Sequence, residues 1–179
     1  TSIDKNDNPV KLFVMGINEW RSEKEWPLKR TVYTPFYFQS DGRANTDMKS
    51  GRLLQEPTEE TQKDYYIHKP NNPVPSLGGG TLFFKGRNNG PRDQREIEKR
   101  EDVVVYTSEP LTEPLEVTGW VKVNLWASSD ASDTDFTAKL VDVLPDGRAY
   151  NLTDGIVRAK YRNEDSEELS LNGEVVQYE

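Results

Sequence analysis

The stretch Leu115–Ser129 reads LEVTGWVKVNLWASS, and its side chains alternate in character along most of its length. One parity is apolar and comprises Leu115, Val117, Val121, Val123, Leu125 and Ala127. The other parity is mostly polar, although it also carries Trp120 and Trp126. A period of two over this length predicts a long β-strand with one buried face and both tryptophans on the outer face. Gly119 lies in line with the buried set and predicts a bulge.

The chain continues as DFTAKLVDVLPDGRAYNLTDGIVRAKY, Asp135–Tyr161, with turn signals at Pro145–Gly147 and at Thr153–Gly155. Proline presets φ for a turn and glycine accepts positive φ, so three consecutive antiparallel strands are expected here. The final run GEVVQYE, Gly173–Glu179, predicts the start of another strand. Only Pro91–Glu101 resembles a helix, and because it is nearly all charged it predicts a short surface turn or coil.

Shorter β-type runs occupy the earlier part of the chain, bounded by loops rich in Gly and Pro. They are Lys11–Gly16, Thr34–Ser40, Lys63–Lys69 and Asp102–Ser108. Many strands, long loops and little helix predict an all-β fold, a jelly-roll β-sandwich of the galactose-binding-domain-like kind. The length of 179 residues fits one such domain over residues 1–179.

The composition restricts the classes of function. The net charge of −8 argues against a nucleic-acid partner and against docking on an anionic membrane, because both need clustered Lys and Arg. There is no cysteine, which excludes disulfides, zinc–thiolate sites and a cysteine nucleophile. No apolar run approaches the length of a membrane span. Nothing in the sequence calls for a cofactor.

A complete catalytic set is not recognisable in the sequence. Serine catalysis of the usual hydrolase kind needs a G-x-S-x-G elbow and a histidine base, and Ser40 and Ser50 lie near glycines without that spacing. The single histidine, His68, is expected to be an ordinary strand residue. Asp130, Asp133 and Asp135 are weak candidates for a metal site, and a tight corner with side-chain-to-backbone hydrogen bonds is the preferred interpretation.

Two other features leave alternatives open. The four tryptophans, Trp120 and Trp126 above all, are compatible with a free-standing carbohydrate-binding module as well as with core and interface packing. The stretch SLGGGTLFFKGRNNGP, Ser76–Pro91, places Leu82, Phe83 and Phe84 between two loops that we expect to be flexible joints. These apolar side chains either fill the core of this domain or are held out toward something else.

Several specific runs resemble one protein family. They are FVMGINEW (Phe13–Trp20), YTSEPLTEPLEVTG (Tyr106–Gly119) and DTDFTAKLVDVLPDGRA (Asp133–Ala149). They are similar to the C-terminal domain of the cocaine-esterase-like (CocE/NonD) hydrolases, which is shared with X-prolyl dipeptidyl peptidases and α-amino acid ester hydrolases. The resemblance extends from Val10 to about Arg162.

The resemblance implies that a preceding α/β-hydrolase domain of the same polypeptide carries a Ser-Asp-His triad and acts on an ester or peptide substrate. This chain would then be catalytically inactive alone and would help to wall the substrate cleft. The family pattern places Phe83 and Phe84 at the substrate pocket, and Trp20, Trp26 and Leu82 are candidates for the domain interface. The pattern also continues with further strands after Tyr178, so we expect open strand edges here that could support self-association.

Overall fold

The computed structural model describes residues 8–80, 88–162 and 173–179, and within these ranges the regular structure is almost entirely β-strand. The helical pieces there are a single turn, α1 (Arg95–Glu98), and a 3-10 turn, η1 (Ala159–Tyr161). The prediction of a short charged turn around Ile97 is therefore confirmed. None of the helices in the described ranges is long and apolar enough to cross a membrane.

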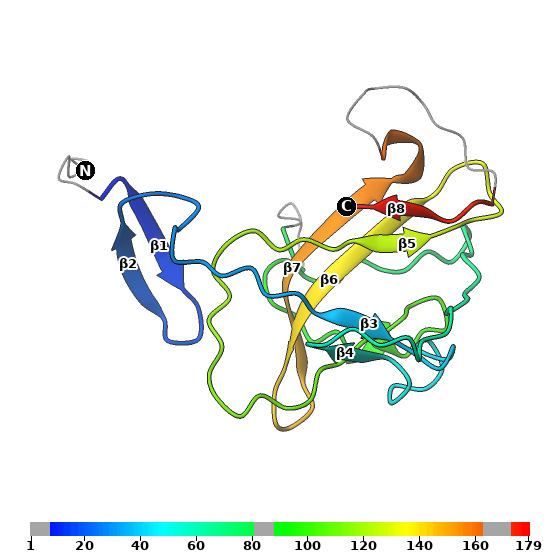
Figure 1. Ribbon diagram of the computed structural model, residues 1–179, viewed down its shortest axis with the longest axis horizontal. Helices are drawn as coiled ribbons and strands as arrows, with labels where there is room; N and C mark the ends of the chain where they lie inside the picture. The colour runs from blue at the N-terminus through cyan, green and yellow to red at the C-terminus, as the bar shows by residue number, and fades with distance from the viewer. Residues whose placement is uncertain (1–7, 81–87, 163–172) are drawn as a thin grey trace. The chain divides into compact units, whose positions relative to one another are not determined.

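The chain divides into two compact units, and the first comprises residues 1–35 and 110–121. Its regular structure is an antiparallel hairpin of β1 (Val10–Val14) and β2 (Glu19–Glu23), drawn in blue in Figure 1. The turn between the strands is possible because Gly16 and Asn18 both adopt positive φ, which these two residue types accept more readily than others do.

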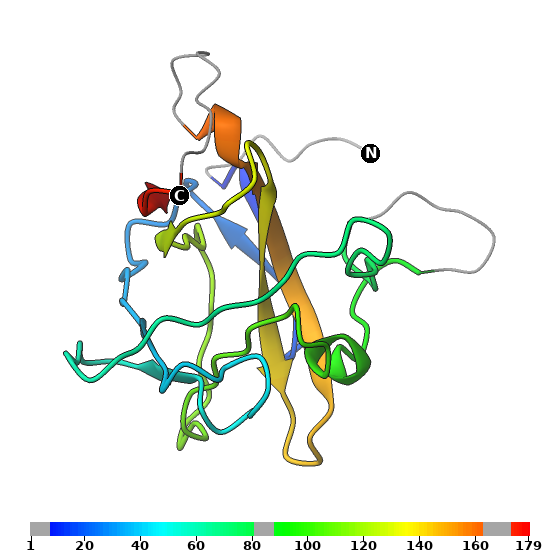
Figure 2. The same ribbon diagram turned by 90° about the vertical axis from the view of Figure 1, so that its right-hand side faces the viewer.

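The second unit comprises residues 36–109 and 122–179, and its described residues hold six strands in three antiparallel pairs. The longest pair joins β6 (Asp135–Val143) to β7 (Ala149–Arg158) through the predicted Pro145–Gly147 turn. The other pairs are β5 (Leu125–Ala127) with β8 (Val176–Tyr178), and β3 (Tyr37–Gln39) with β4 (Arg52–Leu54). Figure 2 shows the β6–β7 ribbon as a long twisted hairpin, as expected for a two-stranded pair.

The core of this unit lies between the β5–β8 pair and the β6–β7 pair. Tyr178 and Ala159 are fully buried at its centre, and the ring of Tyr178 lies 4.7 Å from that of Phe136. The remaining contacts come from Leu125, Ala127, Val157 and Val176. Because residues of all four strands meet in one apolar layer, the two pairs pack face to face, and the predicted all-β sandwich is confirmed.

The long strand predicted at Leu115–Ser129 is shorter than expected. Only Leu125–Ala127 is regular strand, whereas Leu115 and Val117 are exposed. The physical reason is that the run passes from the first unit to the second after Val121. Its alternating apolar side chains therefore do not all face the same core. At Gly119 φ is +150°, and a Cβ there would lie 2.9 Å from a methyl of the neighbouring Thr31.

Two of the other predicted strands are irregular. Lys63–Lys69 and Asp102–Ser108 form no strand, although Thr107 makes an isolated parallel bridge with Arg52 beside β4. The turn predicted at Thr153–Gly155 is also wrong, because β7 continues through it and Gly155 pairs with Ala138 of β6. Instead of a turn, β7 contains a β-bulge next to this stretch.

Candidate functional site

The three apolar residues singled out in the sequence, Leu82, Phe83 and Phe84, lie outside the described residues, because the structure describes the chain up to Gly80 and again from Asn88. What the structure does define is the pair of flanking stretches that forms the base of this segment. We call this base, residues 76–80 and 88–94, the loop base.

Backbone hydrogen bonds hold the two sides of the loop base together. Gly79 and Gly90 form an antiparallel bridge in which each N–H donates to the other's carbonyl oxygen at 2.9 Å. One residue earlier, the N–H of Gly78 donates to the carbonyl of Asn88 at 3.0 Å. The side-chain amide of Asn88 donates in turn to the carbonyl of Ser76 at 2.7 Å. The prediction of flexible joints is therefore wrong at this point, because these glycines are fixed by paired hydrogen bonds.

Two glycines of the loop base, Gly78 and Gly79, are required by close approach rather than by flexibility. Gly78 has φ of +78°, and a Cβ there would lie 2.5 Å from the carbonyl oxygen of Gly90 and 2.7 Å from Oδ1 of Asn151. Gly79 has φ of +79°, and a Cβ there would lie 2.8 Å from Oδ2 of Asp154. Any larger residue at either position would both strain the backbone and collide with its neighbours.

A buried pair of amide side chains, Gln94 and Asn151, lies against the loop base; their exposed fractions are 1% and 2%. The Gln94 amide donates to the carbonyls of Leu77 and Arg92 and to Oδ1 of Asn151, over 2.9 to 3.1 Å. Oδ1 of Asn151 also accepts the backbone N–H of Arg92 at 2.8 Å. The ammonium of Lys139 donates to Oε1 of Gln94 at 2.9 Å. We call these three side chains, Gln94, Asn151 and Lys139, the amide cluster.

The β-bulge in β7 explains why two side chains three residues apart both face the loop base. The bulge lies at Leu152, which has no partner on β6. Asn151 pairs with Val141 and Asp154 pairs with Lys139, and these two β6 residues are two apart and so share a face. Without the extra residue, Asn151 and Asp154 would lie on opposite faces of the hairpin.

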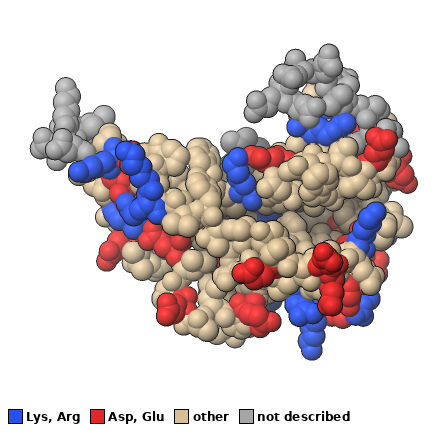
Figure 3. All heavy atoms as spheres, in the orientation of Figure 1, with Lys and Arg blue, Asp and Glu red and all other residues tan. Residues whose placement is uncertain are grey.

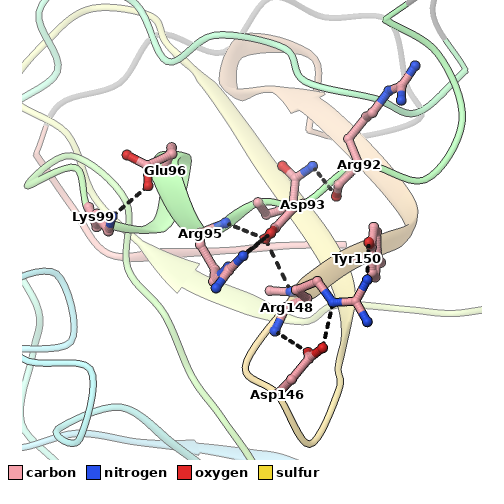
Figure 4. Close-up of polar contacts among 10 residues, drawn as sticks. Arg92, Asp93, Arg95, Glu96, Lys99, Asp146, Arg148 and Tyr150 are labelled. Carbon is pink, nitrogen blue, oxygen red and sulfur yellow. Dashed lines mark hydrogen bonds and ion pairs between the residues drawn. The ribbon is translucent and has the colours of Figure 1, made fainter.

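The returning side of the loop base is also tied to the hairpin by Asp93 (Figure 4). Its carboxylate accepts the backbone N–H of Ala149 at 3.3 Å and pairs with the guanidinium of Arg95 at 2.5 Å. The Arg95 hydrogen bonds hold the pKa of Asp93 well below its usual range. Nearby, the side chain of Arg148 pairs with Asp146 at 2.7 Å in the adjacent turn. The helical turn α1 that follows therefore starts from a fixed point on β7.

The first unit carries a cluster of ion pairs on and beside its hairpin, where Figure 3 shows both signs of charge together. The carboxylate of Glu23 is largely buried and lies between the guanidinium groups of Arg21, at 2.6 Å, and Arg30, at 2.8 Å. Arg21 also makes two hydrogen bonds to Glu116, of 2.6 and 3.0 Å, which with a bond from Thr118 lower the pKa of Glu116 to about 2. These pairs connect the hairpin to residues 110–121 of the same unit.

The two predicted interface tryptophans lie in this unit and are accessible to solvent. Trp20 is 65% exposed, with its ring 5.3 Å from that of Phe13 across the hairpin and the Lys11 ammonium 5.3 Å from its centroid. Trp26 meets Trp120 edge to face at 6.3 Å. The aromatic surface of Trp20 is available to a partner, and its interface role stays a prediction.

His68 lies in an open hollow of about 290 Å³ whose lining is charged. The lining comprises His68, Asp133, Thr134, Asp135 and Arg158, with no serine among the residues that the structure describes there. The carboxylate of Asp135 pairs with Arg158 at 2.8 Å, and that of Asp133 accepts the backbone N–H of Lys160 at 3.2 Å. Within the described ranges no three His, Asp or Glu side chains come together as a metal site would need, and this holds for Asp130, Asp133 and Asp135 too.

The serines near glycines, Ser40 and Ser50, are buried in a second polar cluster that the sequence did not indicate. The hydroxyl of Ser40 donates to Oδ1 of Asp64 at 2.8 Å, and the hydroxyl of Tyr106 donates to Oδ2 of the same carboxylate at 2.7 Å. Ser50 donates to Asp41. Burial and the Asp64 carboxylate raise the pKa of Tyr106. Both serine hydroxyls are thus engaged in holding loops together, and neither contacts His68.

The family match decides what kind of domain this is. Residues 2–177 match the family described as the X-Pro dipeptidyl-peptidase C-terminal non-catalytic domain. The chain belongs to that family. The description of the X-Pro dipeptidyl-peptidase C-terminal domain family calls it non-catalytic.

Curated relatives of this X-Pro dipeptidyl-peptidase C-terminal domain include hydrolases by name. The chain is 57% identical over 153 residues to the cocaine esterase of Rhodococcus sp. (strain MB1 Bresler), covering 86% of this chain and 26% of that protein. It is 32% identical over 167 residues to a Mycobacterium bovis protein and to a Mycobacterium tuberculosis protein, each named "Putative serine esterase". In those two, 88% of this chain and 23% of the relative are covered. The chain therefore spans about a quarter of the length of the curated relatives it matches.

Proposed function

We propose that this chain is the non-catalytic β-sandwich domain of a larger serine hydrolase, of the acyl-esterase or X-Pro dipeptidyl-peptidase type, and that it walls the substrate cleft of an α/β-hydrolase domain. In this proposal Phe83 and Phe84 form part of the cleft wall. They contribute apolar surface and exclude water, and they supply no acid, base or nucleophile.

The observation that carries the proposal is the closed loop base. The bridge between Gly79 and Gly90 and the buried amide cluster next to it hold the two sides of the loop base at a defined separation. A wall residue does need such support, because a displacement of about 1 Å in a reacting complex can change a rate by orders of magnitude. Two adjacent aromatic residues in the segment between these bridging glycines give the wall its apolar character.

The test is an acyl-selectivity measurement on the longer protein that carries this domain. We would compare kcat/KM for p-nitrophenyl acetate and p-nitrophenyl benzoate in the parent protein and in the Phe83→Ala and Phe84→Ala variants. The proposal expects the ratio of the two values to change by about tenfold or more in at least one variant, since a lost aromatic contact changes transition-state binding. Lys69→Ala, on an exposed loop of the described domain, serves as the matched control.

Two results would overturn the proposal. One is an unchanged selectivity ratio in both phenylalanine variants that still fold. The other is ester turnover by this chain alone that survives purification, because the proposal assigns every reactive group to the other domain. A parallel assay with X-Pro p-nitroanilide substrates separates the esterase from the dipeptidyl-peptidase form of the proposal.

A carbohydrate-binding module is the second candidate, and the exposure of Trp126 favours it. Trp126 is 67% exposed on the outer face of the β5–β8 pair, opposite Gln177, whose amide donates to Asn124 at 3.1 Å. An exposed indole beside planar amides is a common arrangement for stacking and hydrogen bonding to a sugar ring. Retardation in affinity gels containing polysaccharides, lost in Trp126→Ala, would support this candidate, whereas unchanged mobility in every gel would reject it.

A further inference from the structure

We propose that the amide cluster of Gln94, Asn151 and Lys139 is a positioning device that sets where the loop base lies and so tunes the acyl selectivity of the cleft. This inference rests on the proposed function, in which the segment beyond the loop base walls the cleft. It assigns a role to three residues that lie outside that segment.

The Gln94 amide joins both sides of the loop base through one side chain. It donates to the carbonyl of Leu77 on the outgoing side and to that of Arg92 on the returning side, at 2.9 and 3.0 Å. Because both bonds start at the same nitrogen, the separation of the two sides is fixed by one rigid planar group. The Gly79–Gly90 bridge above it then has a defined spacing rather than a range.

Lys139 determines which way the Gln94 amide points. Its ammonium donates to Oε1 at 2.9 Å, so the NH₂ group must face the carbonyls. A flipped amide would place its NH₂ against the ammonium and its oxygen against the carbonyls of Leu77 and Arg92, which are two repulsive contacts in a buried site. Lys139 itself is an exposed residue, so this orienting bond comes from the edge of the cluster.

The β-bulge fixes the cluster to the rest of the fold. Asn151 is held in β7, and its Oδ1 accepts both the Gln94 amide at 3.1 Å and the Arg92 N–H at 2.8 Å. These two hydrogen bonds fix the position of the loop base relative to the β6–β7 hairpin. A buried polar network with its bonds satisfied specifies a single arrangement, which is the property a supporting layer of a binding wall needs.

The experiment uses the longer protein and two graded variants. Lys139→Met removes the orienting donor at an exposed position, so the fold is retained, and Gln94→Leu removes the bridging amide itself. Gln55→Leu is the control, because Gln55 is an exposed residue next to β4 and outside the loop base. Thermal melting confirms that each variant folds, and Lys139→Met keeps the test decisive should Gln94→Leu fail to do so.

Two readouts distinguish positioning from a merely structural role. Hydrogen exchange, followed by mass spectrometry of peptides that contain Gly79 and Gly90, is expected to accelerate by about tenfold in Lys139→Met and more in Gln94→Leu. The benzoate-to-acetate ratio of kcat/KM is expected to change by about threefold or more in the same variants and not in Gln55→Leu.

The phenylalanine variants separate failure of this inference from failure of the proposed function. If Phe83→Ala or Phe84→Ala changes the selectivity ratio while folded Lys139→Met leaves it unchanged, the positioning role is overturned and the proposed function stands. If neither phenylalanine variant changes the ratio, the proposed function fails, and the positioning role fails with it. Accelerated exchange with an unchanged ratio in Lys139→Met also overturns the positioning role, since the cluster would then act on stability alone.

Discussion

Gly79 and Gly90 exchange two backbone hydrogen bonds of 2.9 Å, which join the two sides of the loop base across ten intervening residues. At Gly78 and Gly79, neighbouring atoms leave no room for a Cβ, so glycine is needed there because of crowding. The two closest neighbours of a Cβ at Gly78, the carbonyl oxygen of Gly90 and Oδ1 of Asn151, themselves accept hydrogen bonds within the loop base. The features that make the segment look flexible in sequence are the ones that make its base rigid in structure.

This crowding predicts that alanine substitutions at Gly78 and at Gly80, two residues apart, differ in their effect on stability. Gly78→Ala places a Cβ 2.5 Å from a carbonyl oxygen at a φ of +78°, so we expect it to lower the free energy of unfolding by about 2 to 3 kcal/mol. Gly80→Ala meets no atom within 4 Å, so we expect a change within about 0.5 kcal/mol. Chemical denaturation of the two variants measures both values, and equal stabilities would contradict the crowding argument.

Removal of the hydroxyl group of the core residue Tyr178 is expected to stabilise the domain. Tyr178 is buried and its hydroxyl has no hydrogen-bond partner within the described residues, while burial raises its pKa. Tyr178→Phe removes a buried unsatisfied group and keeps the ring against Phe136, so we expect the free energy of unfolding to rise by about 1 kcal/mol.

Tyr178→Ala is the matched comparison, because it empties the centre of the same core. We expect it to lower the free energy of unfolding by about 3 to 5 kcal/mol, in the range found for aromatic-to-alanine changes in cores. Urea unfolding curves of the two variants test the pair. A loss of stability in Tyr178→Phe would show that the hydroxyl is satisfied after all.

The turns show how far the sequence predicts this fold. The Pro145–Gly147 signal is correct because Gly147 adopts φ of +82° and Oδ1 of Asp146 accepts the N–H of Arg148 at 3.1 Å, both local events. The similar signal at Thr153–Gly155 is wrong because pairing with β6 over the whole of β7 competes with it. Hydrophobic alternation likewise predicts local strand character, but not that the Leu115–Ser129 run passes from one compact unit to the other.

The sequence does not predict the contacts of the loop base, because the residues that make them are far apart along the chain. Gln94 and Asn151 are 57 residues apart, and nothing in either local pattern pairs them. Asn151 with Leu152 and Thr153 instead matches a glycosylation sequon. Its burial and its two accepted hydrogen bonds make it a structural residue. The hydrogen bond between Ser40 and Asp64, 24 residues apart, likewise has no local signal in the sequence.

The buried cluster of Ser40, Asp64 and Tyr106 predicts that the domain loses stability in alkaline solution. The pKa of Tyr106 is raised by burial and by its hydrogen bond to Asp64, so the folded state holds the phenolic proton more tightly than the unfolded state does. The stability from this group is fully present below about pH 10, the unfolded value, and is lost as the pH rises toward the folded pKa. The free energy of unfolding, measured from pH 8 to pH 11, should fall less steeply in Tyr106→Phe than in the parent. Equal slopes would mean that Tyr106 titrates alike in both states.

Trp20 and Trp126 give an internal comparison for the predicted domain interface, because their exposed fractions, 65% and 67%, are nearly equal in this domain. If Trp20 docks on a catalytic domain, its ring loses contact with water in the longer protein, since buried aromatic anchors are what such interfaces use. Hydroxyl-radical footprinting of the longer protein should then label Trp20 about threefold or more weakly than Trp126. Denatured protein, in which both indoles react alike, supplies the normalisation for each peptide. Equal labelling of the two tryptophans in the folded longer protein would contradict an interface at Trp20 and leave the ion pairs around Glu23 as features of this unit alone.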